Sequence, residues 1–229
     1  MKDEVAGSMV DSPEGIETRE RILSQAERMF ATRGYDGTSV RQITEAAGAN
    51  VAAVSYYFSG KQGLYEAVFE RVLVEMRERR IHLIKSDLDA VGKDVTLETF
   101  LASFAAAFVE PLVEGERGKD FMSLFDQEMR LHKMPTKAFF EQLIEPMMAL
   151  FAGSLERVGV SVDRSTATMC LMSLVGQLTH ALKASRRFAD GASGESLPMN
   201  LDDMIPHIVH FSAAGIRACA ATSSEERKT

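Results

Sequence analysis

One stretch constrains the fold most strongly: residues 38–61, TSVRQITEAAGANVAAVSYYFSGK, whose spacing specifies a geometry. Ser39 and Gln42 stand three residues apart in the pattern of a capping box, which begins a helix near residue 39. Gly48 follows the apolar periodicity at a position where a left-handed C-cap favours glycine. A second short apolar-periodic run covers residues 51–58. Two short helices joined by a tight turn that contains glycine form a helix-turn-helix.

The second of these helices has one apolar face and one face of small or hydrogen-bonding residues. Val54 and Phe58 lie four residues apart and can face a core. A helix of small residues can lie deep in the major groove of DNA, and phenolic hydroxyls at its far end can reach phosphates. The spacing leaves an alternative open, a helical hairpin inside a bundle with Tyr56 and Tyr57 as half-buried aromatics.

The segment from Glu17 to about Glu70 resembles the DNA-binding domain of the TetR family of bacterial transcriptional regulators. The residues that carry the resemblance are Ile22, Leu23, Ala26, Phe30, Gly34, Thr38, Ile43, Ala47, Gly48, Tyr56, Tyr57, Phe58, Lys61, Leu64 and Tyr65. The resemblance implies an all-α fold, with an N-terminal three-helix helix-turn-helix domain and a C-terminal helical domain for ligand binding and dimerisation. It also implies a DNA-binding surface formed by Thr38, Arg41, Val51, Ala52, Ala53, Ser55, Tyr56, Tyr57 and Lys61. Ser55 departs from the tyrosine that family members often carry at this position.

Four segments are expected along the chain: a disordered arm over residues 1–16, the helix-turn-helix domain over 17–62, the effector-binding and dimerisation domain over 63–220, and a disordered tail over 221–229. A long helix over residues 62–86 should cross from the first domain into the second, so that its movement would tilt the recognition helix.

Apolar stripes predict the remaining helices. One helix should cover residues 17–33 in the first domain. In the second domain, helices should cover residues 97–111, 120–132, 136–158, 163–188 and 201–220, with loops at 114–119 and 189–199. Pro146 should kink or interrupt the helix that contains it.

Phenylalanine stripes and methionines suggest an effector pocket, although any one of these residues is more simply explained as core. The expected lining is Phe104, Phe108, Phe125, Met129, Arg130, Met147, Met172 and Gln177. A pocket of this kind would take a small, mostly apolar molecule whose identity the sequence does not give.

The last two predicted helices each have an apolar face with small residues at its centre. They could finish the core of a monomer, or pair with their copies in a four-helix dimer interface. The family resemblance implies the interface, through Met172, Val175, Gly176, Thr179, Ile205, Ile208, Phe211, Ser212 and Gly215. Patches at Glu128-Met129, Pro135-Thr136, Pro146 and residues 173–177 resemble, more loosely, the regulators grouped with the CecR repressor.

The formal net charge of −7 argues mildly against DNA binding, because phosphates attract basic proteins. However, basic and acidic residues balance over residues 17–71, so the acidity lies elsewhere. The local placement of Arg41 and Lys61 would then matter more than bulk attraction.

Other classes of site find weak support. Glu128 with His132, and His207 with His210, are spaced to share a helix face, but neither pair has a third metal ligand nearby. We expect no catalytic residue, metal or cofactor, and an enzyme using Glu128 and His132 is the weakest alternative. Two further expectations are buried, reduced thiols at Cys170 and Cys219 and a cytoplasmic protein with no signal peptide and no membrane span.

The sequence therefore predicts a ligand-responsive repressor that binds a palindromic operator in double-stranded DNA as a homodimer. The rival interpretation is a helical protein-interaction module that does not bind DNA.

Overall fold

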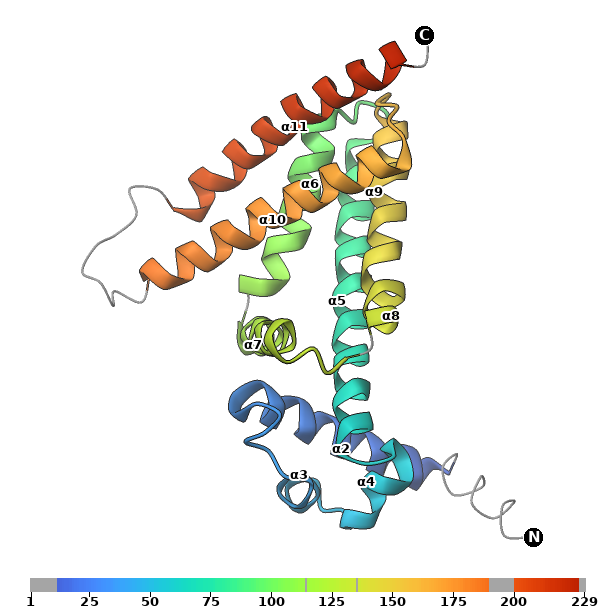
Figure 1. Ribbon diagram of the computed structural model, residues 1–229, viewed down its shortest axis with the longest axis vertical. Helices are drawn as coiled ribbons and strands as arrows, with labels where there is room; N and C mark the ends of the chain where they lie inside the picture. Colours follow the sequence, from blue (N-terminus) through green and yellow to red (C-terminus); the bar gives the residue numbers. More distant parts are fainter. Residues whose placement is uncertain (1–11, 114, 135, 190–199, 227–229) are drawn as a thin grey trace. The chain divides into compact units, whose positions relative to one another are not determined.

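The computed structural model describes residues 12–113, 115–134, 136–189 and 200–226, and every regular element in them is a helix. This confirms the predicted all-α fold. In chain order (Figure 1), the elements are α2 Pro13–Arg33, α3 Val40–Ala46, α4 Val51–Phe58, α5 Lys61–Val91, α6 Leu97–Val113, α7 Gly115–Leu131, α8 Thr136–Phe139, η1 Phe140–Ile144, α9 Glu145–Arg157, α10 Arg164–Ala189 and α11 Leu201–Glu226. Among the described helices, none combines the length and apolarity that crossing a membrane requires.

The chain packs into two compact units. The first contains the chain up to Glu75 together with Glu114–Gln142, and the second contains Met76–Val113 together with the chain from Leu143. The predicted domain boundary at residue 62 therefore lies before the point at which the packing divides, which is inside α5. This helix contributes its first part to one unit and its second part to the other.

Helix α2 begins earlier than predicted. The Ser12 side chain accepts a hydrogen bond from the Gly15 backbone N–H at 3.1 Å, and Pro13 occupies the first turn, where its missing N–H costs nothing. Residues 13–16 are thus helical, which corrects the expectation of a disordered arm up to residue 16. Residues 1–11 lie outside the described part of the chain.

The core of the first unit forms where the apolar faces of three helices meet. Ile22, Ala26 and Phe30 of α2 have no exposed surface, and neither do Ile43 of α3 and Val54 of α4. Each fully buried aliphatic or aromatic side chain contributes roughly 1.5–3 kcal/mol relative to an exposed one. This burial fixes α3 and α4 against α2.

Helix α7 completes the first unit through polar contacts with the end of α2. The Ser123 hydroxyl donates to the Ala31 carbonyl at 2.6 Å, and the Gln127 amide donates to the Phe30 and Ala31 carbonyls at 3.2 and 3.3 Å. The last four carbonyls of a helix have no partners inside the helix, and these side chains satisfy the Ala31 carbonyl and add a second donor to the Phe30 carbonyl, which also accepts from the Gly34 N–H.

Helix α7 also starts before the predicted position. It begins at Gly115, where a loop over residues 114–119 was expected. An ion pair of 2.8 Å between Lys119 and Glu116 lies in this first turn, with the i, i+3 spacing that supports helical structure.

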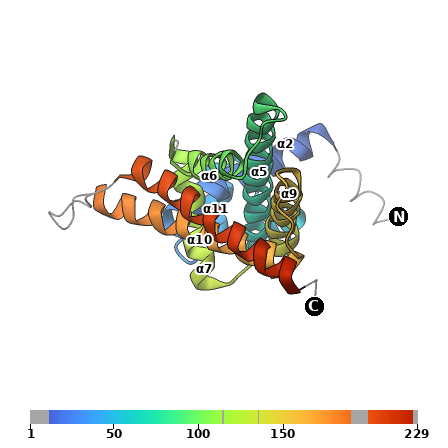
Figure 2. The ribbon, with the colours of Figure 1, turned by 90° about the horizontal axis from the view of Figure 1, so that it is seen from above.

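The second unit has an aromatic core. Phe100, Phe104 and Phe108 of α6 are all buried, so the predicted stripe faces inward. The rings of Phe100 and Phe104 lie 5.4 and 5.5 Å from the ring of Phe151 on α9. Helices α10 and α11 lie side by side (Figures 1 and 2). Helix α11 extends to Glu226, which corrects the predicted end at Ala220.

Pro146 does interrupt its helix, as predicted. A π-helical segment, η1, precedes α9, and Pro146 lies in the first turn of α9. Proline lacks the N–H that an α-helical turn requires and its ring clashes with the carbonyl four residues earlier, so the preceding turn widens.

Candidate nucleic-acid interface

The helix-turn-helix is held by side-chain caps at the start of each helix. The Ser39 hydroxyl accepts from the Gln42 N–H at 3.3 Å while the Gln42 side chain accepts from the Ser39 N–H at 2.9 Å, which forms the predicted capping box. Gly48 has a φ of 61° in the turn, a conformation that glycine adopts without strain. The Asn50 side chain then accepts from the Ala52 N–H at 2.9 Å and starts α4.

Helix α4 separates its buried and accessible faces as the sequence indicates. Val54 and Phe58 are buried, while Val51 and Tyr56 are 49% and 46% exposed. The exposed or half-buried positions are Val51, Ala52, Ala53, Ser55, Tyr56 and Tyr57, all of which were predicted to contact DNA. The Tyr56 and Tyr57 rings lie 5.0 Å apart with an edge-to-face geometry. The accessible face is therefore small at its start and aromatic at its end.

Thr38 has an internal role. Its side chain is 1% exposed, and its hydroxyl contacts the carbonyls of Met29 at 3.1 Å and Gly34 at 2.8 Å. A hydroxyl engaged in this way ties the start of α3 to the end of α2 and cannot reach a phosphate. This corrects the expectation that Thr38 presents its side chain to DNA.

Two lysines gather around Tyr35. The ammonium nitrogens of Lys61 and Lys133 each lie 4.2 Å from the centroid of the Tyr35 ring. Burial, together with the nearby Asp36 and Glu66 carboxylates, raises the pKa of Tyr35. The contact places a second cation near Lys61. Sequence reasoning missed Lys133 because it lies 72 residues after Lys61 in the chain, and only the fold brings the two lysines to the same ring. Arg41, the other predicted basic contact, is exposed on α3.

Gly63 sets the approach of α5 to α4. A Cβ atom at this position would lie 1.9 Å from the backbone carbonyl oxygen of Phe58, which is far inside van der Waals contact. A residue with a side chain would therefore force the start of α5 away from the end of α4. A glycine in the first turn of a helix was the available signal, and the sequence reasoning did not use it.

Two family models match the chain. One, described as bacterial regulatory proteins of the tetR family, matches residues 22–68, and the other, described as the tetracyclin repressor-like C-terminal domain, matches residues 102–215. The chain belongs to the TetR family. The first match contains α3 and α4 together with most of α2, and so includes the caps and the accessible face described above. The looser resemblance to the CecR group stays a prediction.

Individual relatives agree with membership of the TetR family. YttP of Bacillus subtilis, named as an HTH-type transcriptional regulator, is 47% identical over 51 residues, which are 22% of this chain and 25% of that protein. The repressor AcnR of Corynebacterium diphtheriae is 34% identical over 91 residues, which are 34% of this chain and 48% of that protein. The chain thus spans less than half the length of these relatives. A solved TetR-family regulator from Mesorhizobium loti shares the fold, with a TM-score of 0.63 at 19% identity over 91% of this chain and 98% of that one.

The eight residues predicted to line an effector pocket in this TetR protein do not form one cluster within either unit. Phe125, Met129 and Arg130 belong to the first unit, and the other five belong to the second. Met129 and Met172 are 55% and 53% exposed, which corrects the expectation that they line an enclosed pocket of the protomer. Apart from Met172, the second unit holds four of the predicted residues: Phe104, Phe108 and Met147, which are buried, and Gln177, which is half-buried on α10. These four stay candidates for an effector site.

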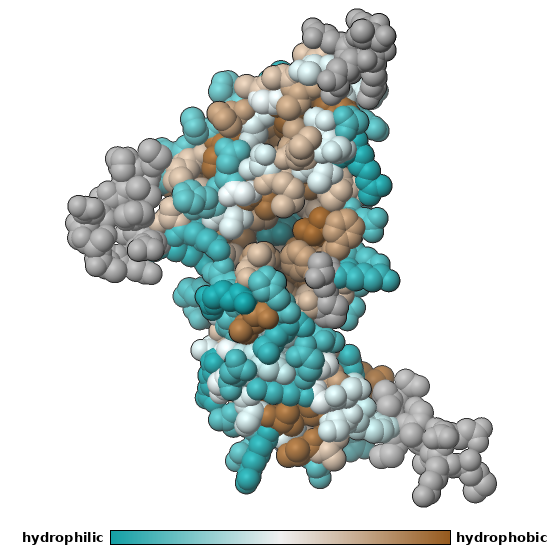
Figure 3. Space-filling view, in the orientation of Figure 1, coloured by the Kyte–Doolittle hydropathy of each residue, from teal (hydrophilic) through white to brown (hydrophobic). Residues whose placement is uncertain are grey.

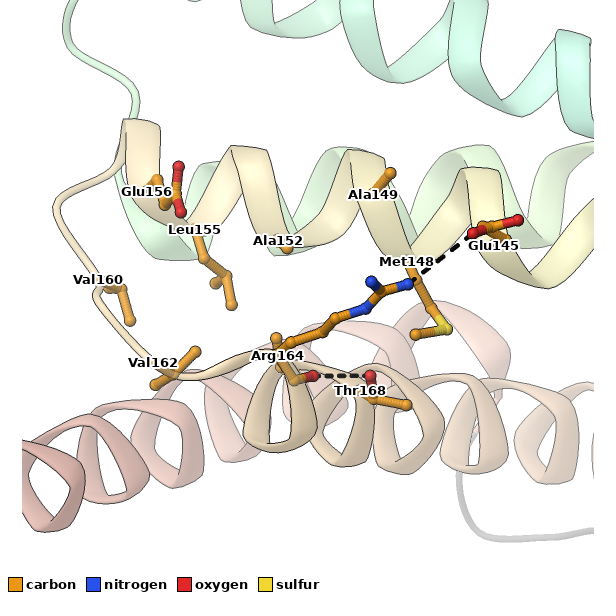
Figure 4. Close-up of a pocket in the computed structure, with 11 residues that line it drawn as sticks. Glu145, Met148, Ala149, Ala152, Leu155, Glu156, Val160, Val162, Arg164 and Thr168 are labelled. Atoms are coloured by element: carbon orange, nitrogen blue, oxygen red, sulfur yellow. Dashed lines mark hydrogen bonds and ion pairs between the residues drawn. The ribbon is translucent and has the colours of Figure 1, made fainter.

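A cavity of about 430 Å³ lies between α9 and the start of α10 (Figure 4). Its floor is apolar, formed in part by Met148, Ala152 and Leu155. The Arg164 guanidinium extends across it toward Glu145, with 3.9 Å between their charged atoms. None of the eight predicted pocket residues lines this cavity. Both charged side chains are exposed, so the ion pair is a weak one.

The residues predicted for a dimer interface divide into two groups. Ile208 and Ser212 are 6% and 8% exposed and pack inside the protomer, which corrects their assignment to the interface. The Gln177 amide donates to the Ser212 hydroxyl at 3.5 Å and so contributes to the contact between α10 and α11. The others are exposed or half-buried, namely Met172, Val175, Gly176, Thr179, Ile205, Phe211 and Gly215.

The exposed group forms part of a wider apolar surface. Met169 on α10 is 60% exposed and Phe211 on α11 is 62% exposed, and the sequence reasoning did not include Met169 in the interface. Figure 3 shows tan and white surface, the colours of apolar residues and of residues with intermediate hydropathy, over much of α10 and α11. Large apolar side chains gathered on one exposed face are typical of interaction surfaces.

The weak alternative sites find no geometric support. Glu128 is buried, and its two carboxylate oxygens accept from the Met134 N–H at 2.7 Å and the Tyr65 hydroxyl at 3.0 Å, while His132 is exposed. In the described part of the chain, histidine, cysteine and acidic residues do not gather in groups suited to a metal. Cys170 is half-buried but Cys219 is exposed, so the expectation of two buried thiols is wrong for Cys219.

Proposed function

We propose that this TetR-family chain is a transcriptional repressor that binds a palindromic operator as a homodimer and is released by a small effector. The observation that carries the proposal is the accessible face of α4, where Ala52, Ser55 and Tyr56 are all exposed. Small side chains let a helix approach the base edges closely, and a tyrosine hydroxyl can donate to a phosphate.

Cations of the first unit would supply the attraction to DNA that the acidic chain as a whole lacks. Arg41 is exposed on α3, and Lys61 and Lys133 converge on Tyr35 in the same unit. Each contact between a cation and a phosphate adds about one ion to the salt dependence of binding. With only a few such cations, we expect the non-specific affinity for DNA to be modest.

Dimerisation would bury the exposed apolar face of α10 and α11. A two-fold axis places the same residue of each protomer in the interface, so Phe211 and Met172 would each be buried twice. Burying the exposed part of a phenylalanine contributes on the order of 2 kcal/mol, and the two copies together contribute about 4 kcal/mol. The dimer symmetry then predicts an operator whose half-sites are related by a two-fold axis.

Helix α5 provides a route from an effector to DNA. It begins at Lys61, where Gly63 approaches the end of α4, and it continues into the second unit as far as Val91. An effector that binds the second unit more tightly in the conformation that cannot bind DNA would release the operator, and operator would weaken effector binding by the same factor. The relative named as a repressor, AcnR, supports repression as the direction of control.

Selection of genomic fragments by the purified protein tests the proposal. We expect enrichment of one palindromic sequence. Footprinting should show that the protein protects both half-sites, and sedimentation should show two protomers bound to each duplex. Recovery of fragments without a common motif would contradict it and would favour the protein-interaction module.

A matched pair of variants tests the dimer. Phe211→Glu places a charge on the exposed face of α11 and should produce monomers, with operator affinity reduced by about a thousandfold. Val91→Glu is the control, because Val91 is also an exposed apolar residue, 40% accessible, but lies on α5. Phe211→Glu protein that still sediments as a dimer would place the interface elsewhere.

A further inference from the structure

A positively charged side chain is buried without a counter-ion in the second unit. Arg80 of α5 is 5% exposed, and in the described part of the chain its guanidinium makes no ion pair. Its Nη2 group donates weakly to the Phe108 carbonyl at 3.4 Å, and the guanidinium carbon lies 4.2 Å from the centre of the Phe108 ring. The Nε–H is buried and has no hydrogen-bond acceptor among the described residues.

This arrangement is costly for the folded protein. A buried charge requires a partner or a full set of hydrogen bonds, and an unpaired buried N–H is itself destabilising. Burial lowers the pKa of Arg80 to about 9, which still leaves the side chain charged at neutral pH. The adjacent Arg79 shows the usual solution, because it is half-exposed and pairs with Glu110 at 3.5 Å.

The surroundings of Arg80 indicate what the missing partner would be. Phe108 covers the guanidinium, and Phe104, one turn earlier on α6, is also buried. The Nε–H and an Nη2–H point in parallel from one edge of the guanidinium, and the only hydrogen bond described for this edge is the long one from Nη2 to the Phe108 carbonyl. Two parallel donors are the geometry that a carboxylate accepts in a bidentate pair. Apolar side chains around one cation would suit an apolar body attached to one negative charge.

We propose that Arg80 binds the anionic group of the effector, and that the effector is an amphipathic carboxylate. The proposal rests on the effector-controlled repression proposed above and adds the chemical class of the ligand. It replaces the mostly apolar effector expected from the sequence with one that carries a single negative charge at the end of an apolar body. Ligand binding would then supply the counter-ion and acceptors that Arg80 does not find among the residues that the structure describes.

Paired probes that differ only in charge test this assignment. Octanoate and octanamide, and 1-naphthoate and 1-naphthamide, would be titrated into the full-length protein, with thermal unfolding and calorimetry as readouts. We expect each carboxylate to raise the melting temperature and to bind about 10- to 100-fold more tightly than its amide, the range expected for charge-assisted hydrogen bonds. Arg80→Met should lose this preference, and Arg80→Lys should keep part of it because the charge remains without the planar pair of donors.

Two further comparisons separate a ligand-binding role from a structural one. Arg80→Met should raise the melting temperature of the unliganded protein, because an unpaired buried charge is replaced by an apolar side chain of similar length. Arg157→Met is the matched control, since Arg157 is an exposed arginine of the same unit that donates to the Gly92 carbonyl at 3.2 Å, and it should keep the preference for carboxylates.

Equal binding of carboxylate and amide by the wild type, absence of any carboxylate binding at millimolar concentration, or an unchanged preference in Arg80→Met would each overturn the assignment. A phosphate monoester that binds through Arg80 while carboxylates do not would also overturn it. The failure of the proposed function looks different. If no operator is found but carboxylates bind through Arg80, the proposal of a repressor fails and the proposed ligand class stands. If an operator is found and carboxylates do not bind, the proposal of a repressor stands and the proposed ligand class fails.

Discussion

Replacement of Glu128 should destabilise the first unit by an amount that depends on how many buried donors lose their acceptor. The carboxylate accepts from the Met134 N–H at 2.7 Å and from the Tyr65 hydroxyl at 3.0 Å, and both donors are buried. Glu128→Ala leaves both unpaired, at a cost of about 1–3 kcal/mol each, so the free energy of unfolding should fall by roughly 2–6 kcal/mol.

Glu128→Gln should cost far less. Its carbonyl oxygen can still accept from the Met134 N–H, and its amide nitrogen can donate to the Tyr65 oxygen, because a phenol both donates and accepts. Only the charge assistance is lost, which we estimate at about 1 kcal/mol. In a protein of this size 1 kcal/mol corresponds to roughly 2–4 °C in melting temperature, so Glu128→Ala should lower it by roughly 4–24 °C.

Calorimetry and urea denaturation monitored by circular dichroism would measure both variants. Glu141→Ala is the control, because Glu141 is exposed in the same unit and pairs with Lys137 at 3.7 Å on the surface. A double-mutant cycle of Tyr65→Phe with Glu128→Gln should give a coupling energy of about 0.5–3 kcal/mol. Equal losses in Glu128→Ala and Glu128→Gln, or a loss in Glu128→Ala no larger than in Glu141→Ala, would refute the reasoning.

Three further outcomes follow from particular contacts. Gly63→Ala should weaken operator binding by at least about tenfold with the helical content unchanged, because the added Cβ would collide with the Phe58 carbonyl. Circular dichroism would measure the helical content and DNA titration the affinity. An unchanged affinity would argue against the close approach of α5 to α4. Lys133→Ala and Lys61→Ala should each reduce the slope of log operator affinity against log salt concentration by about one. Salt titrations would measure this slope, and an unchanged slope for Lys133→Ala would show that Lys133 does not contact DNA. The stability advantage of Arg80→Met over the wild type should shrink as pH rises above about 9. The folded wild type then sheds the buried charge, while the guanidinium of the unfolded chain, whose pKa burial does not lower, stays charged. Denaturation at pH 7 and pH 10.5 would measure this, and a constant difference would contradict it.

The helix-turn-helix could be predicted closely because its determinants are local. The capping box at Ser39 and Gln42, the glycine at position 48 and the apolar spacing of Val54 and Phe58 all act within a few residues, and each has the predicted geometry. The accessible face of α4 followed from the same periodicity.

Features that depend on distant parts of the chain escaped sequence reasoning. Lys133 reaches Tyr35 only because the fold returns α7 to the first unit, and the Thr38 hydroxyl is internal because α2 ends beside it. The periodicity of α11 predicts that Ile208 lies on its apolar face, but it does not predict which element covers that face. In the structure, α11 packs against α10 and α6 of the same protomer, and Ile208 is buried. Arg80 was overlooked because an arginine in a charged run, EMRERR, gives no sign in the sequence that its side chain is buried.

Fluorescence anisotropy with the selected palindrome and a scrambled duplex tests the central claim most directly. The wild type should bind the palindrome at least about a thousandfold more tightly than the scrambled sequence, with two protomers per duplex. Arg41→Ala and Tyr56→Phe should weaken binding to the palindrome with the fold intact, and Lys93→Ala, an exposed lysine of the second unit, should bind as the wild type does. Equal affinity for the two duplexes, or binding by Arg41→Ala and Tyr56→Phe that matches Lys93→Ala, would contradict the account of α3 and α4 as the surface that reads DNA.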